Sequence, residues 1–554
     1  MLGAALATWV ASGANEELEA RFRDASATGF GPVFTLRIEQ CSTGAVEFLT
    51  LLDRFRAWGA GGVLVSMPVA DEEGWRALGR VSEACAESGM ELGVCDFVIS
   101  RQEDASLPRA RCLAWSMRDG GASAVATNGL PDVVCRERSR EVATLAIPVS
   151  PVLEHYQVLD LGVSIPLTEG HWRELRFGSV EASPPVIDPF DERAVIQHVN
   201  EALEALQSRL SASYGRSLVW YQCVGVRRSE LLWPSDMGAL FLKRNGLDLA
   251  RHLPALAGFP LGGEATAAHV RRQVAEAVCD AWRGRYAQNI RDLVQEAGLD
   301  AGMRVDEAPV APEEVPYYFR RPVITAARSE RERLANVRAA GAARACARRT
   351  IMGRVPLRPI WTAVETPLYG FPFKRELDGL FADGATRVLL EADNALWNDE
   401  RLSDAFRAVG AYARRCQLLL MRGEPVADLL VWDEAGLSRY EGYSCDRASR
   451  AMLEEASVRG TAIELPSERK YAALAVSTRM LREPAAERLV RQLAEKGLTL
   501  WVADNGDVED REFIARATQS DAPFARLFRG AAGGVPQPDM TWTSDVEGLR
   551  LRFT

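Results

Sequence analysis

Short apolar runs rich in β-branched residues alternate with longer amphipathic stretches over the first 400 residues. Such runs are typical of buried strands, and they lie at 32–38, 61–68, 91–100, 123–128, 217–226 and 386–392. Segments 194–215 and 268–297 repeat apolar residues at helical spacing, which predicts long amphipathic helices. Alternating strands and helices predict a parallel sheet. With a buried first strand near the N-terminus, about seven or eight strands precede residue 400, which favours a (β/α)8 TIM-like barrel over an open doubly wound sheet.

The alternation restarts from about Gln417. Further strands are expected at 417–422, 425–433, 461–466, 471–478 and 497–504, with helices around 447–459 and 483–496. This order predicts a smaller flavodoxin-like α/β domain. No glycine-rich nucleotide motif accompanies it, which favours a structural or assembly role. The expected division is a (β/α)8 barrel over 1–410, the flavodoxin-like domain over 411–520, and a tail with a short β hairpin over 521–554.

Charge and composition exclude several classes of protein. The chain has 66 basic and 76 acidic residues and a net charge of −10, so it does not attract phosphate backbones, and we expect no nucleic acid partner. The arginine-rich segment 326–349 is interpreted as a solvated helix face. No run reaches the roughly 20 apolar residues that span a bilayer, so we expect no membrane association.

The ten cysteines form no Cys-x-x-Cys pair and indicate free thiols, a reducing compartment and no zinc site. The N-terminus lacks the basic segment of a signal peptide. These features together predict a cytoplasmic protein. Its oligomeric state stays open.

Carboxylates that directly follow apolar runs are the first candidates for chemistry, because barrel enzymes carry their sites at the carboxyl ends of strands. The candidates are Asp96, Asp306, Glu307, Glu365 and Glu391. Cleavage of a glycosidic bond needs two carboxyl groups, one protonated to assist the leaving oxygen and one that activates water or attacks. The placement of these residues therefore suits a glycosidase.

Aromatic residues near the same strand ends can stack on the apolar faces of sugar rings. Trp9, Tyr221 and Trp361 are the candidates for such a platform. The helical His198 and His269 are interpreted as packing or surface residues, since no histidine has metal-ligand spacing. The sequence also lacks a G-x-S-x-G nucleophile motif.

The order of several segments resembles glycoside hydrolase family 106, the α-L-rhamnosidase-like barrel enzymes. The segments that carry the resemblance are 7–35, 75–97, 186–221, 233–256, 270–307 and 364–392, and segment 447–504 is similar to the flavodoxin-like domain that follows the barrel in such enzymes. The resemblance implies that Glu307, in VDEAP, and Glu365, in VETP, are the catalytic carboxylates. It also implies calcium, for which Asp306, Glu307 and Glu365 supply hard oxygen ligands, whereas the residues by themselves call for no cofactor.

The chain departs from the family's pattern after the strand at 217–226. Gln222, Cys223 and Val224 stand where the family has Asp-Glu-Pro. Of an Asp-Glu pair expected after 91–95, only Asp96 is present, and Glu391 stands where a histidine is often found. One expected carboxylate is therefore missing.

Three functions follow. The first is a hydrolase that inverts an α-L-rhamnoside or related sugar, with Glu365 and Glu307 as acid and base in either order and with Asp96, Asp306, Trp9, Tyr221, Trp361 and Glu391 binding the carbohydrate. The second is a degenerate barrel that binds a glycan or protein without cleaving it. The third is another reaction on a sugar or small natural product, with a new acid or base such as Asp96, Cys223 or Glu391.

Overall fold

The computed structural model of the 554-residue chain describes most of the first 500 residues. The described residues are 20, 22–24, 30–38, 46–99, 108–119, 125–127, 140–148, 159–160, 172–182, 186–226, 231–260, 262–357, 370–422, 425, 427, 429–433, 445–481 and 483–503.

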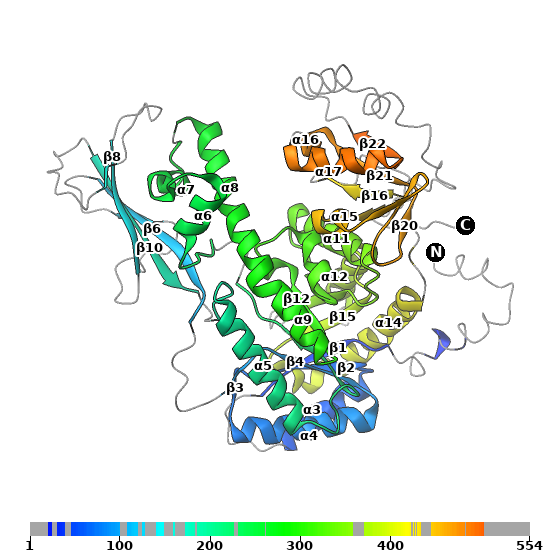
Figure 1. The fold of residues 1–554 in the computed structure, drawn as a ribbon. Helices are drawn as coiled ribbons and strands as arrows, with labels where there is room; N and C mark the ends of the chain where they lie inside the picture. The colour runs from blue at the N-terminus through cyan, green and yellow to red at the C-terminus, as the bar shows by residue number, and fades with distance from the viewer. Residues whose placement is uncertain are drawn as a thin grey trace.

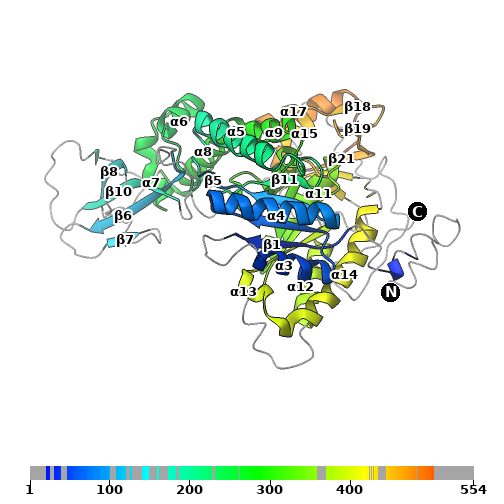
Figure 2. The ribbon, with the colours of Figure 1, turned by 90° about the horizontal axis from the view of Figure 1, so that it is seen from below.

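Eight of the described strands form a closed parallel barrel (Figures 1 and 2). In order around the barrel they are β1 (Val33–Arg37), β2 (Gly62–Ser66), β4 (Glu91–Cys95), β11 (Leu218–Gln222), β12 (Asp300–Arg304), β13 (Arg321–Thr325), β14 (Met352–Pro356) and β15 (Arg387–Glu391). The ring closes where Val33 of β1 pairs with Leu389 of β15. The barrel prediction is confirmed, and the open sheet is excluded.

Helices surround the barrel (Figure 2). The larger ones are α3 (Val46–Ala57), α4 (Glu72–Ser88), α5 (Glu192–Arg209), α8 (Glu264–Trp282), α9 (Gln288–Glu296), α11 (Glu330–Ala345), α12 (Gly370–Ala382) and α14 (Ser403–Arg422), and the π-helical turn η4 (Arg283–Ala287) joins α8 to α9. Side chains satisfy backbone N–H groups at several helix starts, as in α5, where Asp191 accepts from the N–H of Ala194 at 3.0 Å. The long helices predicted at 194–215 and 268–297 are thus present.

Large side chains and buried charges fill the barrel interior. Trp220 of β11 is 1% exposed and lies against Gly93 of β4, where an added Cβ would come within 1.3 Å of the indole nitrogen. Below it, at the amino ends of the strands, the Arg321 guanidinium lies 5.1 Å from the centre of the Trp220 ring. This interior is a packed core, so a ligand can enter only at the mouth formed by the strands' carboxyl ends.

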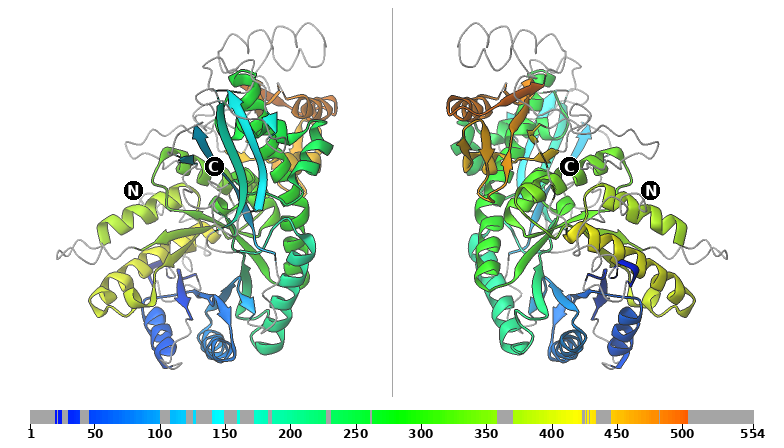
Figure 3. Two further views of the ribbon diagram at one scale, coloured as in Figure 1. Left: turned by 90° about the vertical axis from the view of Figure 1, so that its left-hand side faces the viewer. Right: turned by 90° about the vertical axis from the view of Figure 1, so that its right-hand side faces the viewer.

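A separate antiparallel sheet is inserted between the third barrel strand, β4, and helix α5. It contains β6 (Arg111–Asp119), β7 (Val125–Thr127), β8 (Arg140–Pro148), β9 (Leu159–Asp160) and β10 (Trp172–Glu181), in the spatial order β7-β6-β10-β8-β9. It projects from one side of the barrel (Figures 1 and 2) and faces the viewer in the left panel of Figure 3. The run at 123–128 was expected to be a barrel strand. That prediction is wrong, because its residues pair as β7 at the edge of this sheet.

The C-terminal unit contains a parallel sheet of four described strands. They are β16 (Leu429–Trp432), β17 (Cys445–Arg447), β21 (Ala473–Ser477) and β22 (Leu500–Ala503), in the order β17-β16-β21-β22. The helices are α15 (Arg450–Glu454), α16 (Thr478–Leu481) and α17 (Pro484–Glu495), and a small antiparallel sheet contains β18 (Ser457–Arg459), β19 (Ala462–Glu464) and β20 (Lys470–Tyr471).

Two predictions near this unit need correction. Residues 417–422 do not form a strand but end helix α14, where Gln417 and Leu418 are buried. Helix α11 is not simply a solvated face: its alanine-rich side is buried, and Arg344 reaches Asp446 of β17 at 2.7 Å. The tail at 521–554 lies outside the described residues, and the domain limits stay predictions. No helix among the described residues combines the length and apolar character that a membrane crossing needs.

Candidate functional site

Five of the predicted site residues lie in the described part of the chain, namely Asp96, Tyr221, Asp306, Glu307 and Glu391. Glu365, Trp361 and Trp9 lie outside the described residues, so their roles stay predictions. Asp96 directly follows β4, Asp306 and Glu307 follow β12 in the short turn η5 (Val305–Glu307), and Glu391 ends β15. They are all at the carboxyl ends of barrel strands, where the rule for this fold expects a site.

Asp96 is held by two side chains from different elements. Its Oδ1 accepts a hydrogen bond from the Tyr221 hydroxyl of β11 at 2.5 Å and lies 2.7 Å from Nε2 of His198 on α5. A carboxylate only accepts hydrogen bonds, so Nε2 of His198 carries a proton and donates it. The side chains of His198 and Asp96 are 9% and 15% exposed, and Tyr221 is 1% exposed.

The electrostatic effects within this cluster follow from burial and charge. Burial alone would lower the pKa of His198, but the charge and hydrogen bond of Asp96 outweigh it and raise that pKa above its ordinary value. Burial, with a contribution from the Asp96 charge, raises the pKa of the Tyr221 hydroxyl well above its ordinary value. Tyr221 therefore stays a neutral donor, and His198 holds a positive charge to higher pH than a free histidine.

Glu307 is a buried carboxyl group that follows β12, two strands around the barrel from β4. Its side chain is 12% exposed, Oε1 lies 2.8 Å from Nη1 of Arg304, and Oε2 accepts from the backbone N–H of Gly225 at 3.3 Å. Gly225 permits this approach, since an added Cβ would lie 2.5 Å from the Glu307 carbonyl oxygen. Burial raises the pKa of Glu307, and the favourable charge of Arg304 only partly offsets it. A carboxyl group that binds its proton more tightly is suited to donate that proton to a leaving oxygen.

Two further carboxylates at the mouth are paired with arginines. Glu391 of β15 forms an ion pair with Nε of Arg354 on β14, and its side chain is 38% exposed. Asp306 binds Nη2 of the same Arg304 at 2.7 Å, with its side chain 53% exposed. Substrate binding by Asp306 and Glu391 stays a prediction.

Cys95, the last residue of β4, shows how these groups converge. Burial raises the pKa of its thiol, and the charges of Glu391, Asp96 and Glu307 raise it further. The three carboxylates belong to three different strand ends of the same mouth, those of β4, β12 and β15. Each also has a cationic or proton-donating partner, which lets the negative charges coexist at one mouth.

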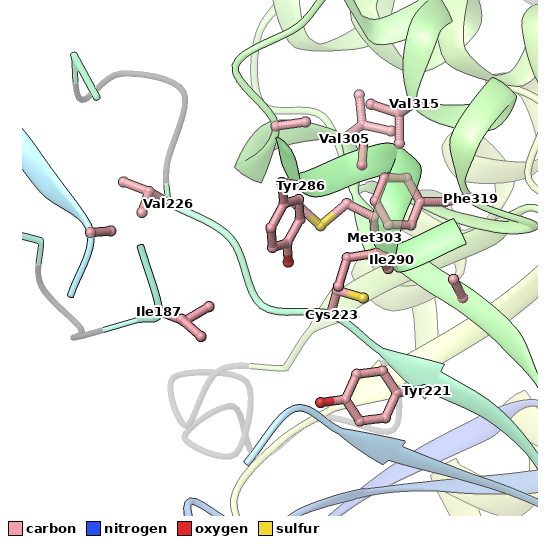
Figure 4. Close-up of a cluster of buried hydrophobic side chains, with 14 of the residues drawn as sticks. Ile187, Tyr221, Cys223, Val226, Tyr286, Ile290, Met303, Val305, Val315 and Phe319 are labelled. Carbon is pink, nitrogen blue, oxygen red and sulfur yellow. The ribbon is translucent and has the colours of Figure 1, made fainter. Parts of the chain in front are cut away.

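The segment where a carboxylate is missing is packed with neutral side chains. Gln222 is 5% exposed and lies against Gly302, while Cys223 is 1% exposed. Figure 4 shows Cys223 with the Tyr221 ring on one side and the Tyr286 ring on the other. Burial raises the pKa of the Cys223 thiol well above its ordinary value, which makes it a poor nucleophile.

The calcium prediction has no support from these contacts. Asp306 and Glu307, two of its three expected ligands, share Arg304, whose positive charge opposes a cation at the same place. Among the residues that the structure describes, no three His, Cys, Asp or Glu side chains form a metal-binding group. The described ligands do not fit the ion, and we assign it no step.

His198 was assigned to packing from the sequence, whereas the structure places it against a candidate site residue. A signal was available in the helix. His198 falls on the same face of α5 as the buried Val195, Val199 and Ala202, and a polar ring on an apolar face requires a buried partner.

Comparison with known proteins shows similarity of fold. No protein-family model matches the chain, and no curated protein matches it. A solved rhamnosidase from Novosphingobium sp. PP1Y matches with a TM-score of 0.61 and 14% identity, over 91% of this chain and 72% of that chain. The catalytic domain of a β-amylase from Paenibacillus polymyxa matches with a TM-score of 0.31 and 9% identity, over 71% of this chain and 99% of that chain. At this TM-score the second likeness bears on nothing further, and the first shows that this chain has a fold similar to that of the solved rhamnosidase.

Proposed function

We propose that the protein is a glycoside hydrolase that acts on an α-L-rhamnoside or a related sugar at the mouth of its barrel. The observation that carries the proposal is Glu307, a buried carboxyl group with a raised pKa at the end of β12. It shares the mouth with Asp96 and Glu391, which stand at the carboxyl ends of β4 and β15. The likeness of the fold to a rhamnosidase supports the choice of sugar.

In this mechanism Glu307 is the general acid. It donates its proton to the glycosidic oxygen as the bond to the anomeric carbon breaks, and the resulting carboxylate is stabilised by Arg304 at 2.8 Å. Glu365 is the second carboxyl group, which takes a proton from the attacking water. Asp96, Glu391, Trp9 and Trp361 contribute to sugar binding, and the buried Tyr221 holds Asp96 through its hydroxyl.

The test measures kcat/KM for two substrates in each of three proteins, namely wild type, Glu307→Gln and Glu365→Gln. The dinitrophenolate group of a 2,4-dinitrophenyl α-L-rhamnoside leaves as an anion without being protonated. The alkoxide group of an alkyl α-L-rhamnoside is a poor leaving group and needs a proton from a general acid. We expect Glu307→Gln to lower kcat/KM about 100- to 10,000-fold for the alkyl substrate and far less for the dinitrophenyl one, while Glu365→Gln impairs both. Glu83→Gln, on the exposed face of α4, is the matched control. Equal losses for both substrates in Glu307→Gln, or no turnover by wild type, would refute the assignment.

A second candidate function is sugar binding without cleavage. It is favoured by the segment Gln222–Cys223, which is buried and neutral where a carboxylate was expected. Isothermal titration of methyl α-L-rhamnoside distinguishes the two: binding without turnover of any rhamnoside supports a binding protein.

The order β17-β16-β21-β22 also supports a flavodoxin-like identity for the C-terminal unit. In this order β16, the first strand of the parallel sheet along the chain, lies between β17 and β21, the second and third. This unit contacts the barrel through α11 and the Arg344–Asp446 pair, which supports a structural role.

A further inference from the structure

The cluster of Asp96, His198 and Tyr221 is graded in exposure from the mouth inwards. Asp96 has the most exposed side chain, at 15%, followed by His198 at 9%, and Tyr221 is 1% exposed as a residue. Both hydrogen bonds go to the same oxygen, Oδ1. Asp96 is therefore the member best placed to touch a ligand, and the other two support it from behind.

The chemistry of the cluster selects a type of ligand group. A carboxylate that already accepts two hydrogen bonds can only accept further ones, so the matching group is a donor such as a sugar hydroxyl. A ligand carboxylate would instead meet the like charge of Asp96, to which it could donate no hydrogen bond.

The charged and titratable surroundings of His198 come from several elements. Asp96 follows β4, Tyr221 belongs to β11, Glu201 lies one turn along α5, and Arg109 precedes β6. Asp96 is the dominant favourable charge on the imidazole, and Arg109 opposes it. The orientation of His198 is thus set by Asp96, and in turn His198 fixes the carboxylate.

We propose that His198 and Tyr221 are positioning residues that hold the Asp96 carboxylate as the acceptor for one hydroxyl of a neutral sugar. This rests on the proposed site, and it adds a role for His198 and a selection against anionic sugars. It does not require hydrolysis.

The experiment measures binding of L-rhamnose, which has no glycosidic bond to cleave, and of its 2-, 3- and 4-deoxy analogues by isothermal titration. Loss of a hydrogen bond to a charged group weakens binding about 10- to 100-fold, so one deoxy analogue should bind that much more weakly to wild type. The same analogue and its parent should bind almost equally to Asp96→Asn. His198→Ala should weaken binding of the parent about tenfold, and His198→Gln, whose amide can still donate to Asp96, should restore most of it. His269→Ala, on the exposed face of α8, is the control.

Two further readouts separate the outcomes. Asp96→Asn should lower the pKa of His198 measured by NMR, because the charge that raises it is removed. D-glucose and D-glucuronate form a matched pair of a neutral and an anionic sugar. Asp96→Asn should reduce the ratio of the affinity for D-glucose to that for D-glucuronate, because it removes the negative charge that repels the glucuronate carboxylate.

Binding by Asp96→Asn and His198→Ala equal to wild type overturns the inference and leaves the proposed hydrolase intact. Loss of binding in Asp96→Asn but not in His198→Ala overturns the positioning role alone. Failure of every neutral sugar to bind the wild type overturns both proposals. Binding with the expected dependence on Asp96, but without turnover, supports the inference and removes the hydrolase.

Discussion

Removing the charge of Glu91 should destabilise the barrel without changing its mouth. Glu91 begins β4 at the amino end of the barrel, and its Oε2 accepts from Arg321 of β13 at 2.8 Å and from Arg387 of β15 at 2.6 Å. Arg321 also binds Asp300 of β12 at 2.9 Å. One carboxylate thus links three strands that are far apart in the sequence.

The size of the effect follows from what Glu91→Gln leaves behind. Arg387 is 1% exposed, and without Glu91 its remaining hydrogen-bond acceptor among the described residues is the neutral Gly61 carbonyl at 3.2 Å. Breaking a fully buried pair costs about 3–5 kcal/mol. The Glu91 side chain is 38% exposed, so we expect a loss of about 2–3 kcal/mol. With an unfolding entropy of about 2.1 cal/mol/K per residue over roughly 300 barrel residues, this lowers Tm by about 4 °C.

The assay is thermal unfolding followed by circular dichroism, together with sugar binding. Glu91→Gln should lose stability but bind methyl α-L-rhamnoside as wild type does, and Glu87→Gln, exposed at the end of α4, should match wild type in both. The double variant Glu91→Gln/Arg387→Met should be less destabilised than Glu91→Gln alone, because it removes the stranded charge. The single variant Arg387→Met completes the comparison. If the stability losses of Glu91→Gln and Arg387→Met simply add up to the loss of the double variant, the ion-pair explanation is wrong.

The same pair predicts a dependence on pH. Burial would raise the pKa of Glu91, but the charges of Arg387 and Arg321 outweigh it and lower that pKa. The stabilisation is therefore present above the unfolded pKa of about 4.3 and is lost as the pH falls through the folded pKa. Wild type should lose its advantage over Glu91→Gln in acid.

Three further predictions concern other parts of the chain. Gly93→Ala should lower the free energy of unfolding by about 3 kcal/mol or more, or prevent folding, because its Cβ would lie 1.3 Å from the indole nitrogen of Trp220. The control is Gly79→Ala on α4, which has open space around it and should raise the Tm measured by thermal unfolding. Arg344→Ala strands the buried carboxylate of Asp446 and should speed proteolytic release of the C-terminal unit. Because the pKa of His198 is raised in the fold, its protonated form stabilises the folded state, fully so below the unfolded pKa of about 6.5. The Tm advantage of wild type over His198→Gln should therefore shrink as the pH rises through the folded pKa.

The barrel could be predicted from the sequence where its strands are continuous apolar runs. Strands β1, β2, β4 and β15 are of this kind, because parallel strands are buried on both faces. Strands β12 and β14 read DAGMR and MGRVP and give a weaker signal, since glycines there make room for neighbouring side chains.

The inserted antiparallel sheet was missed because it follows a different rule. In β10 the buried Leu175 and Phe177 alternate with the more exposed Glu174 and Arg176. Alternation with a period of two is typical of a sheet with one solvated face. A search for continuous apolar runs passes over such a strand.

At the site, the acidic residues were predictable and their partners were not. A carboxylate that ends a barrel strand points to the mouth whatever its neighbours are. Which cation lies opposite depends on strand register and on helix placement: Arg354 reaches Glu391 across the β14–β15 pair, and His198 reaches Asp96 from a helix about 100 residues further along the chain.

The partners separate the carboxylates by chemistry. Arg354 forms an ion pair with Glu391, and its guanidinium group is permanently charged. Arg304 is divided between Asp306 and Glu307, so its charge neutralises neither completely, and burial is left to raise the pKa of Glu307. An acid that must release and regain a proton in each catalytic cycle needs this incomplete neutralisation. Loss of the competing carboxylate in Asp306→Asn should give Glu307 the whole charge of Arg304 and lower its pKa, so the alkaline limb of the pH–activity profile should move to lower pH; an unmoved limb would show that Glu307 is not the acid.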